Sequence, residues 1–529
     1  MNSRLGNRSQ ITSSLGAKID VARNEMGNVS QITASRSEQE NWTASMQYNE
    51  LGQEIERILP RDVISKWQYD VASRPTHHRI NSQNRDTRRR VYNWDVNHRL
   101  RSMVNELTGI RVSYGYDEFS NLVWTNQGDQ FDFLHRSVDD VGNLYETKEK
   151  TDRVYGAGSR LLETREAIFS YDEEGNLVQK VENNGGTWKY EYNGNGMMSK
   201  VIKPDNTEVT FKYDSLGRRI EKCSDEKTMK FVWDGNTILH EYFLRNNSDI
   251  FENIDEYSSQ NNSEIPDNLV TWVFNDGFIP SAKITNEGNY SIISDYLGTP
   301  VEAFDEEGNK VWSAELDIYG RMVEFTGGQD FIPFRYQGQY EDREIGLYYN
   351  RFRYYSPSEG MYLQQDPIGL AGGNPTLYGY VSDLNIQFDP FGLFTADQVM
   401  NFGDKAVGDW GEKITSKYLK SNGFKVLGSV QNKSNQGFDL VAIERATGEL
   451  NVIEVKTSRK GFRSKSNMPR WTKNNIQTIM ENSNGHWGNM PSYQKDLMGM
   501  IEEAQSKGTI KNKLVQINVD KRRIKIKCK

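Results

Sequence analysis

The sequence of 529 residues contains little cysteine, proline and histidine, with 2, 13 and 6 residues of these types. Cys223 and Cys528 lie far apart, so they form neither a disulfide framework nor a zinc-binding pattern. No stretch approaches the roughly 20 apolar residues that a membrane-spanning helix needs. The first residues lack the apolar segment of a signal peptide, so we expect any export signal to lie outside this sequence.

The sequence is rich in glycine and tyrosine, with 44 and 27 residues. Many glycines and tyrosines combined with few prolines are typical of a turn-rich β protein and not of a disordered chain. The length alone predicts more than one domain.

The charge is distributed unevenly along the chain. Residues 394–529 carry 24 basic and 13 acidic residues, a net charge of +11, whereas the rest of the chain carries 41 and 60, a net charge of −19. This asymmetry predicts a polyanion-binding module attached to an acidic carrier. The alternative is that the basic surface is the ordinary surface of a small domain.

A short phrase recurs at spacings of about 20 residues. It consists of an aromatic residue, Asp or Asn, two or three further residues, often Gly, and then Asn or Arg. Asp or Asn followed by Gly is turn chemistry, and the intervening residues alternate between apolar and polar as strands do. Each repeat is therefore predicted to be a β-hairpin, and stacked hairpins to form a long curled sheet. The phrases start at Tyr48, Tyr69, Tyr92, Tyr116, Tyr171, Tyr192, Tyr213 and Tyr296.

These phrases resemble the YD repeats of the Rhs family, which includes bacterial toxins and the teneurins. The resemblance implies an all-β YD-repeat shell over residues 1–335, a core-associated plug over residues 336–393 and a separate C-terminal domain over residues 394–529. Because the repeats begin without a capping segment, the shell is predicted to be truncated at its N-terminus.

The segment from Arg351 to Leu393 contains two copies of the motif DPxGL, which begin at Asp366 and Asp389. The segment resembles the Rhs core-associated signature, which implies self-cleavage between Leu393 and Phe394. The same resemblance gives catalytic roles to Asp366 and Asp389 and a supporting role to Arg353. Two carboxyl groups that share a small site have pKa values pushed apart, so one can activate water while the other stays protonated. The alternative is that both aspartates are turn residues before proline.

Residues 394–529 are predicted to form one small α/β domain. A helix with the stripe Val407, Trp410, Ile414 and Tyr418 comes first, followed by a strand. A hairpin is predicted from a strand starting at about Gly437 and a second strand over residues 450–456. A mixed region with Trp471, a helix over residues 492–508 and one or two edge strands over residues 513–528 follow.

Asp439, Glu454 and Lys456 form the chemical centre of this domain. Residues two apart in a strand share a face, so Glu454 and Lys456 point the same way as Leu450 and Val452. The hairpin brings Asp439 close to Glu454, and two carboxylates beside a lysine suit Mg²⁺, or Mn²⁺, with Asp439 and Glu454 as ligands. The metal would polarise a phosphate and activate water, and the lysine would stabilise developing charge.

This pattern resembles the PD-(D/E)xK nucleases, which have a restriction-endonuclease-like fold. The resemblance makes Asp439, Glu454 and Lys456 catalytic, and it adds Glu412, which lies in a helix-borne GxxGE phrase. In this sequence Asp439 is preceded by Gly437 and Phe438, so the PD part of the motif reads Gly-Phe-Asp instead of Pro-Asp. The alternative is a solvated carboxylate–lysine ladder without catalytic function.

A basic run follows the second strand of the hairpin. Its composition predicts phosphate contacts with one stacking aromatic residue, and the alternative is a solvated loop with a core tryptophan. The residues are Arg459, Lys460, Arg463, Lys465, Arg470, Trp471 and Lys473.

The sequence therefore predicts an Rhs-type polymorphic toxin whose released C-terminal domain is a metal-dependent endonuclease, with DNA as preferred substrate. The alternatives are an RNase or tRNase tip and a non-catalytic nucleic-acid-binding or adhesin Rhs protein. The predicted partners are nucleic acid, an acidic immunity protein and a secretion apparatus or upstream Rhs portion. Delivery by a bacterial secretion system would bring the domain into the target-cell cytoplasm.

Overall fold

A computed structural model describes residues 8–36, 41–128, 132–246, 265–275, 277–367, 369, 374, 376–393, 396–397, 415, 419, 424–431, 437–458, 468–482, 487, 490–518 and 523–528. The chain divides into two compact units, Met1–Asp397 and Gln398–Lys529. Within the described residues, no helix is long and apolar enough to cross a membrane.

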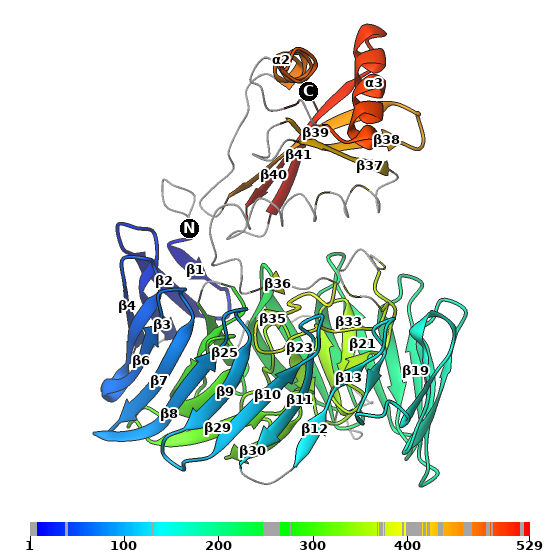
Figure 1. Ribbon diagram of the computed structural model, residues 1–529. Coiled ribbons are helices and arrows are strands. Elements are labelled where there is room, and N and C mark those ends of the chain that lie inside the picture. The colour runs from blue at the N-terminus through cyan, green and yellow to red at the C-terminus, as the bar shows by residue number, and fades with distance from the viewer. Residues whose placement is uncertain are drawn as a thin grey trace, which may run out of the picture. The chain divides into compact units, whose positions relative to one another are not determined.

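The first large sheet contains 12 antiparallel strands that follow one another in chain order. Figure 1 shows these strands side by side, coloured from blue to cyan. They are β1 Gln10–Thr12, β2 Ala17–Arg23, β3 Val29–Arg36, β4 Trp42–Tyr48, β5 Glu54–Leu59, β6 Val63–Tyr69, β7 Pro75–Ser82, β8 Arg85–Trp94, β9 Leu100–Asn105, β10 Arg111–Tyr116, β11 Leu122–Gln127 and β12 Phe133–His135.

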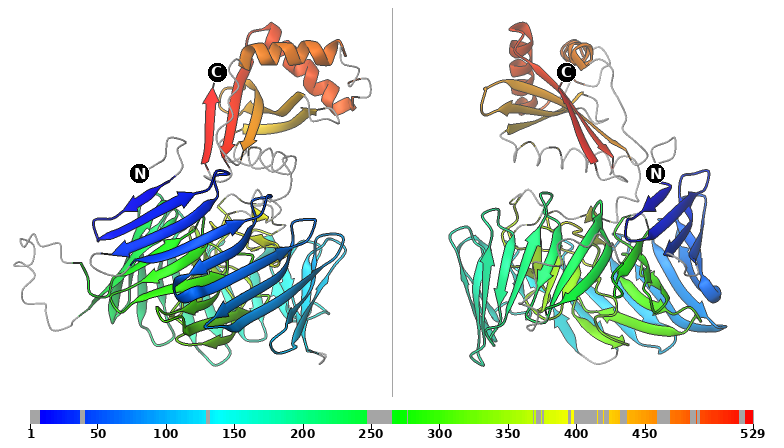
Figure 2. Two further views of the ribbon diagram at one scale, coloured as in Figure 1. Left: turned by 90° about the vertical axis from the view of Figure 1, so that its left-hand side faces the viewer. Right: turned by 180° about the vertical axis from the view of Figure 1, so that it is seen from behind.

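The second large sheet contains 16 strands, again in chain order. Figure 2 shows each large sheet as a curved wall, the first in its left view and the second in its right view. The strands are β15 Arg153–Tyr155, β16 Leu161–Thr164, β17 Ala167–Tyr171, β18 Leu177–Glu182, β19 Thr187–Tyr192, β20 Met198–Ile202, β21 Glu208–Tyr213, β22 Arg219–Cys223, β23 Lys227–Asp234, β24 Thr237–Arg245, β25 Val270–Phe274, β26 Pro280–Ile284, β27 Asn289–Ser294, β28 Pro300–Phe304, β29 Lys310–Leu316 and β30 Met322–Thr326. The prediction of an all-β shell of sequential hairpins is confirmed.

The recurring Asp closes the turn of its own repeat. Asp70 Oδ1 accepts hydrogen bonds from the backbone N–H groups of Ala72 and Arg74, at 2.9 and 3.0 Å, and Oδ2 accepts one from Arg74 Nε at 2.7 Å. The fifth residue of the turn is therefore Arg or Asn because its side chain binds the second carboxylate oxygen. The same double contact occurs in the pairs Asp95–Arg99, Asp117–Asn121, Asp139–Asn143, Asp172–Asn176, Asp214–Arg218, Asp305–Asn309 and Asp317–Arg321.

The recurring aromatic residue joins each repeat to the preceding one. The Tyr69 hydroxyl donates a hydrogen bond to the backbone carbonyl of Glu54 at 2.8 Å. In the repeat at residues 92–99, Trp94 makes this contact instead of Tyr92, with which the sequence phrase begins. The Trp94 indole N–H donates a hydrogen bond to the backbone carbonyl of Pro75. The same contact is made by Tyr48, Tyr116, Tyr192, Tyr213 and Trp233.

The predicted continuous sheet is interrupted near residue 136. Among the described strands, β13 (Ser137–Val138) and β14 (Leu144–Tyr145) pair only with each other. The buried Arg136 side chain donates hydrogen bonds to the carbonyls of Val381 and Ser382, so this part of the chain binds the segment of residues 336–397, which we call the junction segment. The shell consequently consists of two large sheets instead of one.

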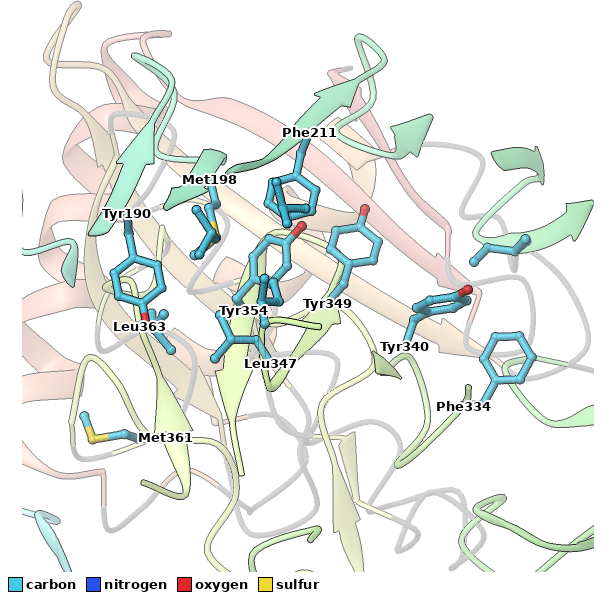
Figure 3. Packing of buried hydrophobic residues seen from close by; sticks show 14 of the residues in the cluster. Tyr190, Met198, Phe211, Phe334, Tyr340, Leu347, Tyr349, Tyr354, Met361 and Leu363 are labelled. Carbon is cyan, nitrogen blue, oxygen red and sulfur yellow. The ribbon is translucent and has the colours of Figure 1, made fainter. Parts of the chain in front are cut away.

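The junction segment packs against both large sheets. It contains the four-stranded sheet β31 Tyr340–Asp342, β32 Leu347–Asn350, β33 Arg353–Ser356 and β34 Met361–Tyr362, and the pair β35 Gln387–Phe388 and β36 Ala396–Asp397. Figure 3 shows Phe211 of β21 and Tyr354 of β33 pointing toward one another, with ring centroids 5.4 Å apart. Side chains of the junction segment therefore share one hydrophobic cluster with the second sheet and another with the first.

A buried ion pair connects the junction to the wall. The Arg219 guanidinium on β22 contacts both carboxylate oxygens of Asp342 on β31, and the two residues are 1% and 0% exposed. Burial alone would raise the pKa of Asp342, but the charges of Arg219 and Lys222 lower it. The Arg219 guanidinium also lies 4.4 Å from the centroid of the Tyr349 ring.

The C-terminal unit contains a mixed five-stranded sheet in the order β37-β38-β39-β40-β41, with β39 and β40 parallel. The elements are β37 Phe424–Gln431, β38 Gly437–Glu444, β39 Leu450–Ser458, α2 Met468–Met480, α3 Ser492–Ser506, β40 Lys511–Asn518 and β41 Arg523–Cys528. The predicted hairpin corresponds to β38 and β39. One expectation was wrong, because the mixed region is the helix α2 from residue 468 onward. The one or two edge strands expected over residues 513–528 are two strands, of which β40 is interior and β41 forms the sheet edge opposite β37.

We expect Asp342→Asn to lower the free energy of unfolding of the shell by about 3–5 kcal/mol, because it leaves the Arg219 charge buried without its carboxylate. Urea unfolding of the full chain measures this change. Glu191→Gln is the control, since its ion pair with Lys200 is exposed and should be worth less than about 1 kcal/mol. Equal effects of the two substitutions would contradict the role of the buried pair.

Candidate self-cleavage and nuclease sites

Arg353 brings together the two aspartates of the DPxGL motifs. Its Nη2 lies 3.0 Å from Asp366 Oδ2 and 3.3 Å from Asp389 Oδ2. The three residues are 1%, 7% and 0% exposed. One guanidinium thus binds two buried carboxylates that come from positions 23 residues apart in the sequence.

Asp389 also binds the chain just before the predicted cleavage point. Its Oδ1 accepts hydrogen bonds from the backbone N–H of Leu393 at 3.0 Å and of Phe391 at 3.3 Å. Arg353 Nε donates to the backbone carbonyl of Gly392. The carboxylate and the guanidinium therefore both contact residues within two positions of the bond between Leu393 and Phe394. Phe394 itself lies outside the described residues.

Two glycines allow the chain to approach this site closely. Gly392 has φ +64°, and a Cβ atom there would lie 2.5 Å from the carbonyl oxygen of Asn350. Gly338 has φ +91°, and a Cβ atom there would lie 2.2 Å from the carbonyl oxygen of Pro390. Because the neighbours are backbone atoms, neither position can accept a larger residue without displacement of the junction.

Tyr362 and Asn350 also belong to this site, although they are not among the residues predicted from the motif. The Tyr362 hydroxyl donates to Asp389 Oδ2 at 2.9 Å. Asn350 Nδ2 donates to the Tyr362 hydroxyl at 2.7 Å and to the Asp389 carbonyl at 2.8 Å. Burial and the charge of Asp389 raise the pKa of Tyr362 well above its ordinary value, so the phenol stays protonated. Their only sequence signal was position, since Tyr362 lies in the aromatic-rich segment Arg351–Leu393 and Asn350 directly precedes it.

In the C-terminal unit, the Asp439 carboxylate contacts the two neighbouring strands. Its Oδ2 accepts a hydrogen bond from the backbone N–H of Val455 on β39 at 2.7 Å, and its Oδ1 accepts one from Gln431 Nε2 on β37 at 2.9 Å. Leu440 on β38 pairs with Ile453 on β39 in the antiparallel hairpin. Asp439 precedes Leu440 and Glu454 follows Ile453, so Asp439 and Glu454 are neighbours across the two strands.

Glu454 and Lys456 point to the same face of β39, as predicted. They form an ion pair, with side chains 4% and 36% exposed. Leu450 and Val452 belong to the hydrophobic cluster that includes side chains of α2 and α3, whereas Ile453 and Val455 belong to the other cluster.

Asp439 and Glu454 are chemically suited to a magnesium ion, which takes one or two carboxylates and completes its coordination with water and phosphate oxygens. Within the described part of the chain, no group of three or more His, Cys, Asp or Glu side chains gathers in a way that could hold a metal. Among the described residues, Asp439 and Glu454 are thus the carboxylates that could hold a metal here.

The basic run is only partly covered by the structure. Arg470 and Lys473 are exposed on α2. Trp471 is partly buried and packs edge-on against Phe438, with ring centroids 5.4 Å apart, which agrees with the alternative of a core tryptophan. Glu412, Arg459, Lys460, Arg463 and Lys465 lie outside the described residues.

Residues 55–371 match the family model of the teneurin YD-shell. The chain is 30% identical over 324 residues to the double-stranded DNA deaminase toxin A of Burkholderia cenocepacia, and the alignment covers 58% of this chain and 22% of the relative. It is 29% identical over 291 residues to the probable deoxyribonuclease RhsA of Dickeya dadantii, covering 53% and 18%. The chain thus spans about a fifth of the length of these relatives.

Among solved structures, the chain is similar to the TcdB2–TccC3–Cdc42 crystal structure, with a TM-score of 0.53 and 17% identity. The match covers 74% of this chain and 21% of the other. At this identity the similarity concerns the fold alone. It agrees with the two curved sheets described above.

We expect Gly392→Ala to lower the free energy of unfolding by about 1–3 kcal/mol more than Gly346→Ala does. Both glycines have positive φ, but an added Cβ atom meets the Asn350 carbonyl only at Gly392 and open space at Gly346. Thermal unfolding of the two full-length variants measures the difference. If both substitutions lower the free energy of unfolding equally, the close contact between Gly392 and the Asn350 carbonyl does not restrict the residue at position 392.

Proposed function

Because the chain belongs to the teneurin YD-shell family, we propose that it is an Rhs-type toxin that cleaves itself after Leu393 and carries a metal-dependent nuclease in its C-terminal unit. The observation that carries the self-cleavage is the convergence of Asp366 and Asp389 on Arg353, beside the chain that leads to Leu393. The naming of one relative as a toxin and another as a probable deoxyribonuclease supports the proposal.

The self-cleavage is a hydrolysis. The ionised carboxylate takes a proton from water, and the water oxygen bonds to the carbonyl carbon of Leu393 while the protonated carboxyl group donates a hydrogen bond to the carbonyl oxygen. The carbon–nitrogen bond then breaks, and the nitrogen of Phe394 receives a proton to leave as an amine. The products are a C-terminal carboxylate on Leu393 and a new N-terminus on Phe394. Arg353 holds both carboxylates in one place throughout.

The nuclease proposal is supported by Asp439, Glu454 and Lys456. Asp439 and Glu454 would hold Mg²⁺ or Mn²⁺, which when bound polarises the phosphodiester and lowers the pKa of a water molecule. The Lys456 side chain is partly exposed, and its ammonium group would stabilise negative charge on the phosphate. The order of strands, with β38 and β39 carrying the motif and β40 parallel to β39 after two helices, is consistent with a restriction-endonuclease-like core.

DNA is the proposed substrate, since the resembled nucleases mostly cut DNA and one relative is named a probable deoxyribonuclease. An acidic immunity protein would protect the producing cell from the +11 segment. A secretion system would deliver the chain, and the released domain would act in the target-cell cytoplasm.

We expect the full chain to yield two fragments, residues 1–393 and 394–529, whose masses are measured by mass spectrometry. Asp366→Asn and Asp389→Asn should each abolish the cut, because each removes one of the two protonation states that hydrolysis needs. Asp205→Asn, in an exposed turn, is the control. An uncut parent chain, or a cut at another bond, would contradict the proposal.

We expect the chain to degrade plasmid DNA in the presence of Mg²⁺ and to lose this activity with a chelator. Asp439→Ala and Lys456→Ala should each lower the rate by roughly 10²-fold or more. Lys495→Ala is the control, since Lys495 is exposed on α3. Total RNA offered together with the plasmid tests the RNase alternative, and retained cleavage by Asp439→Ala would place the active site elsewhere.

A further inference from the structure

Arg353 alone does not distinguish the two carboxylates of the self-cleavage site. The same nitrogen, Nη2, lies 3.0 Å from Asp366 and 3.3 Å from Asp389. Its charge therefore stabilises the ionised form of either residue to a similar extent. Hydrolysis needs one carboxylate and one carboxylic acid, so a further group has to make the two residues different.

The Tyr362 hydroxyl is such a group. It donates to Asp389 Oδ2 at 2.9 Å, on the oxygen that also faces Arg353. A hydrogen bond donated to a carboxylate favours the ionised form. Asp389 Oδ1 in turn accepts from the backbone N–H groups of Leu393 and Phe391, so the four donors together turn Oδ1 toward the chain that leads to the predicted bond.

The orientation of the Tyr362 hydroxyl is itself fixed. Asn350 Nδ2 donates to the Tyr362 oxygen at 2.7 Å, so the hydroxyl proton is free to point at Asp389. Asn350 and Tyr362 are 0% and 1% exposed. The Arg353 guanidinium lies 3.7 Å from the centroid of the Tyr362 ring, which holds the ring against it.

We propose that Tyr362 is a positioning residue for self-cleavage, which makes Asp389 the ionised base and leaves Asp366 as the protonated acid. This inference rests on the proposed self-cleavage after Leu393. Tyr362 acts through Asp389 and does not contact the reacting atoms. Its hydrogen bond acts together with those from the backbone N–H groups of Leu393 and Phe391 to favour the ionised form of Asp389 and to turn Oδ1 toward the substrate chain.

The test compares Tyr362→Phe with the parent in the full chain. Each protein is labelled by brief cell-free synthesis and diluted into buffers from about pH 4.5 to pH 9, and the 136-residue fragment is followed over time. The variant is expected to cleave about tenfold or more slowly at low pH, the effect of losing a hydrogen bond to a charged group. Because Asp389 then binds its proton more tightly, the acid limb of the pH–rate profile moves to higher pH, and the rates converge in alkaline buffer.

Tyr355→Phe is the matched control. Its hydroxyl is also buried and donates to the backbone carbonyl of Tyr319 at 2.7 Å. It should leave the position of the acid limb unchanged, since no contact to Asp389 is lost. If thermal unfolding shows that Tyr362→Phe is not folded, Asn350→Ser is the second variant. It keeps the phenol of Tyr362 and is expected to move the acid limb of the pH–rate profile in the same direction by a smaller amount.

The outcomes separate the two ideas. A parent chain that does not cleave overturns the proposed self-cleavage. A parent that cleaves, with a Tyr362→Phe profile that is superimposable or lowered equally at every pH, leaves self-cleavage intact and overturns the role of Tyr362.

Discussion

The ion pair between Arg219 and Asp342 is the contact on which the arrangement of the junction depends. It connects β22 of the wall with β31, and β31 pairs in turn with β32 and β32 with β33. Arg353 is the first residue of β33, so its position follows from where β31 lies against the wall. A buried charge pair tolerates little displacement, since each partner left alone would be an uncompensated charge in an apolar interior. The pair therefore helps to set where the candidate self-cleavage site lies against the wall.

The two candidate sites differ in access, and this difference matches the reactions proposed for them. The groups around Arg353 and Asp389 are almost completely buried, which suits a substrate that is part of the same chain. Glu454 is also buried, but the Lys456 side chain is 36% exposed and can meet a substrate that arrives from solution. An intramolecular reaction gains its rate from fixed proximity, whereas an intermolecular one needs an accessible charged group for its substrate.

The sequence predicted the repeats well because their information is local. The Asp of each turn binds residues two and four positions later, and alternation within a strand shows which residues are buried. The two-sheet division was not predictable, because Arg136 leaves the repeat pattern to bind carbonyls about 245 residues further along the chain.

The candidate sites were predictable only in part. The DPxGL motifs and the segment around them indicated Asp366, Asp389 and Arg353, whereas nothing in the sequence shows that folding brings Tyr362 and Asn350 to Asp389. In the C-terminal unit the hairpin followed from its turn, whereas α2 was missed since its apolar residues are few, and Trp471 was placed with the basic residues although it packs on Phe438.

The pairing of β35 with β36 has a consequence for the chain after a cut. Gln387 pairs with Asp397 and Phe388 with Ala396, so the two strands lie on opposite sides of the bond between Leu393 and Phe394. The compact N-terminal unit likewise extends to Asp397. Hydrolysis would therefore break the peptide bond between Leu393 and Phe394 while the backbone hydrogen bonds between β35 and β36 still held the new N-terminal end. Liberation of the C-terminal piece would then be a second event, governed by dissociation of a two-residue strand and separable in time from the chemistry.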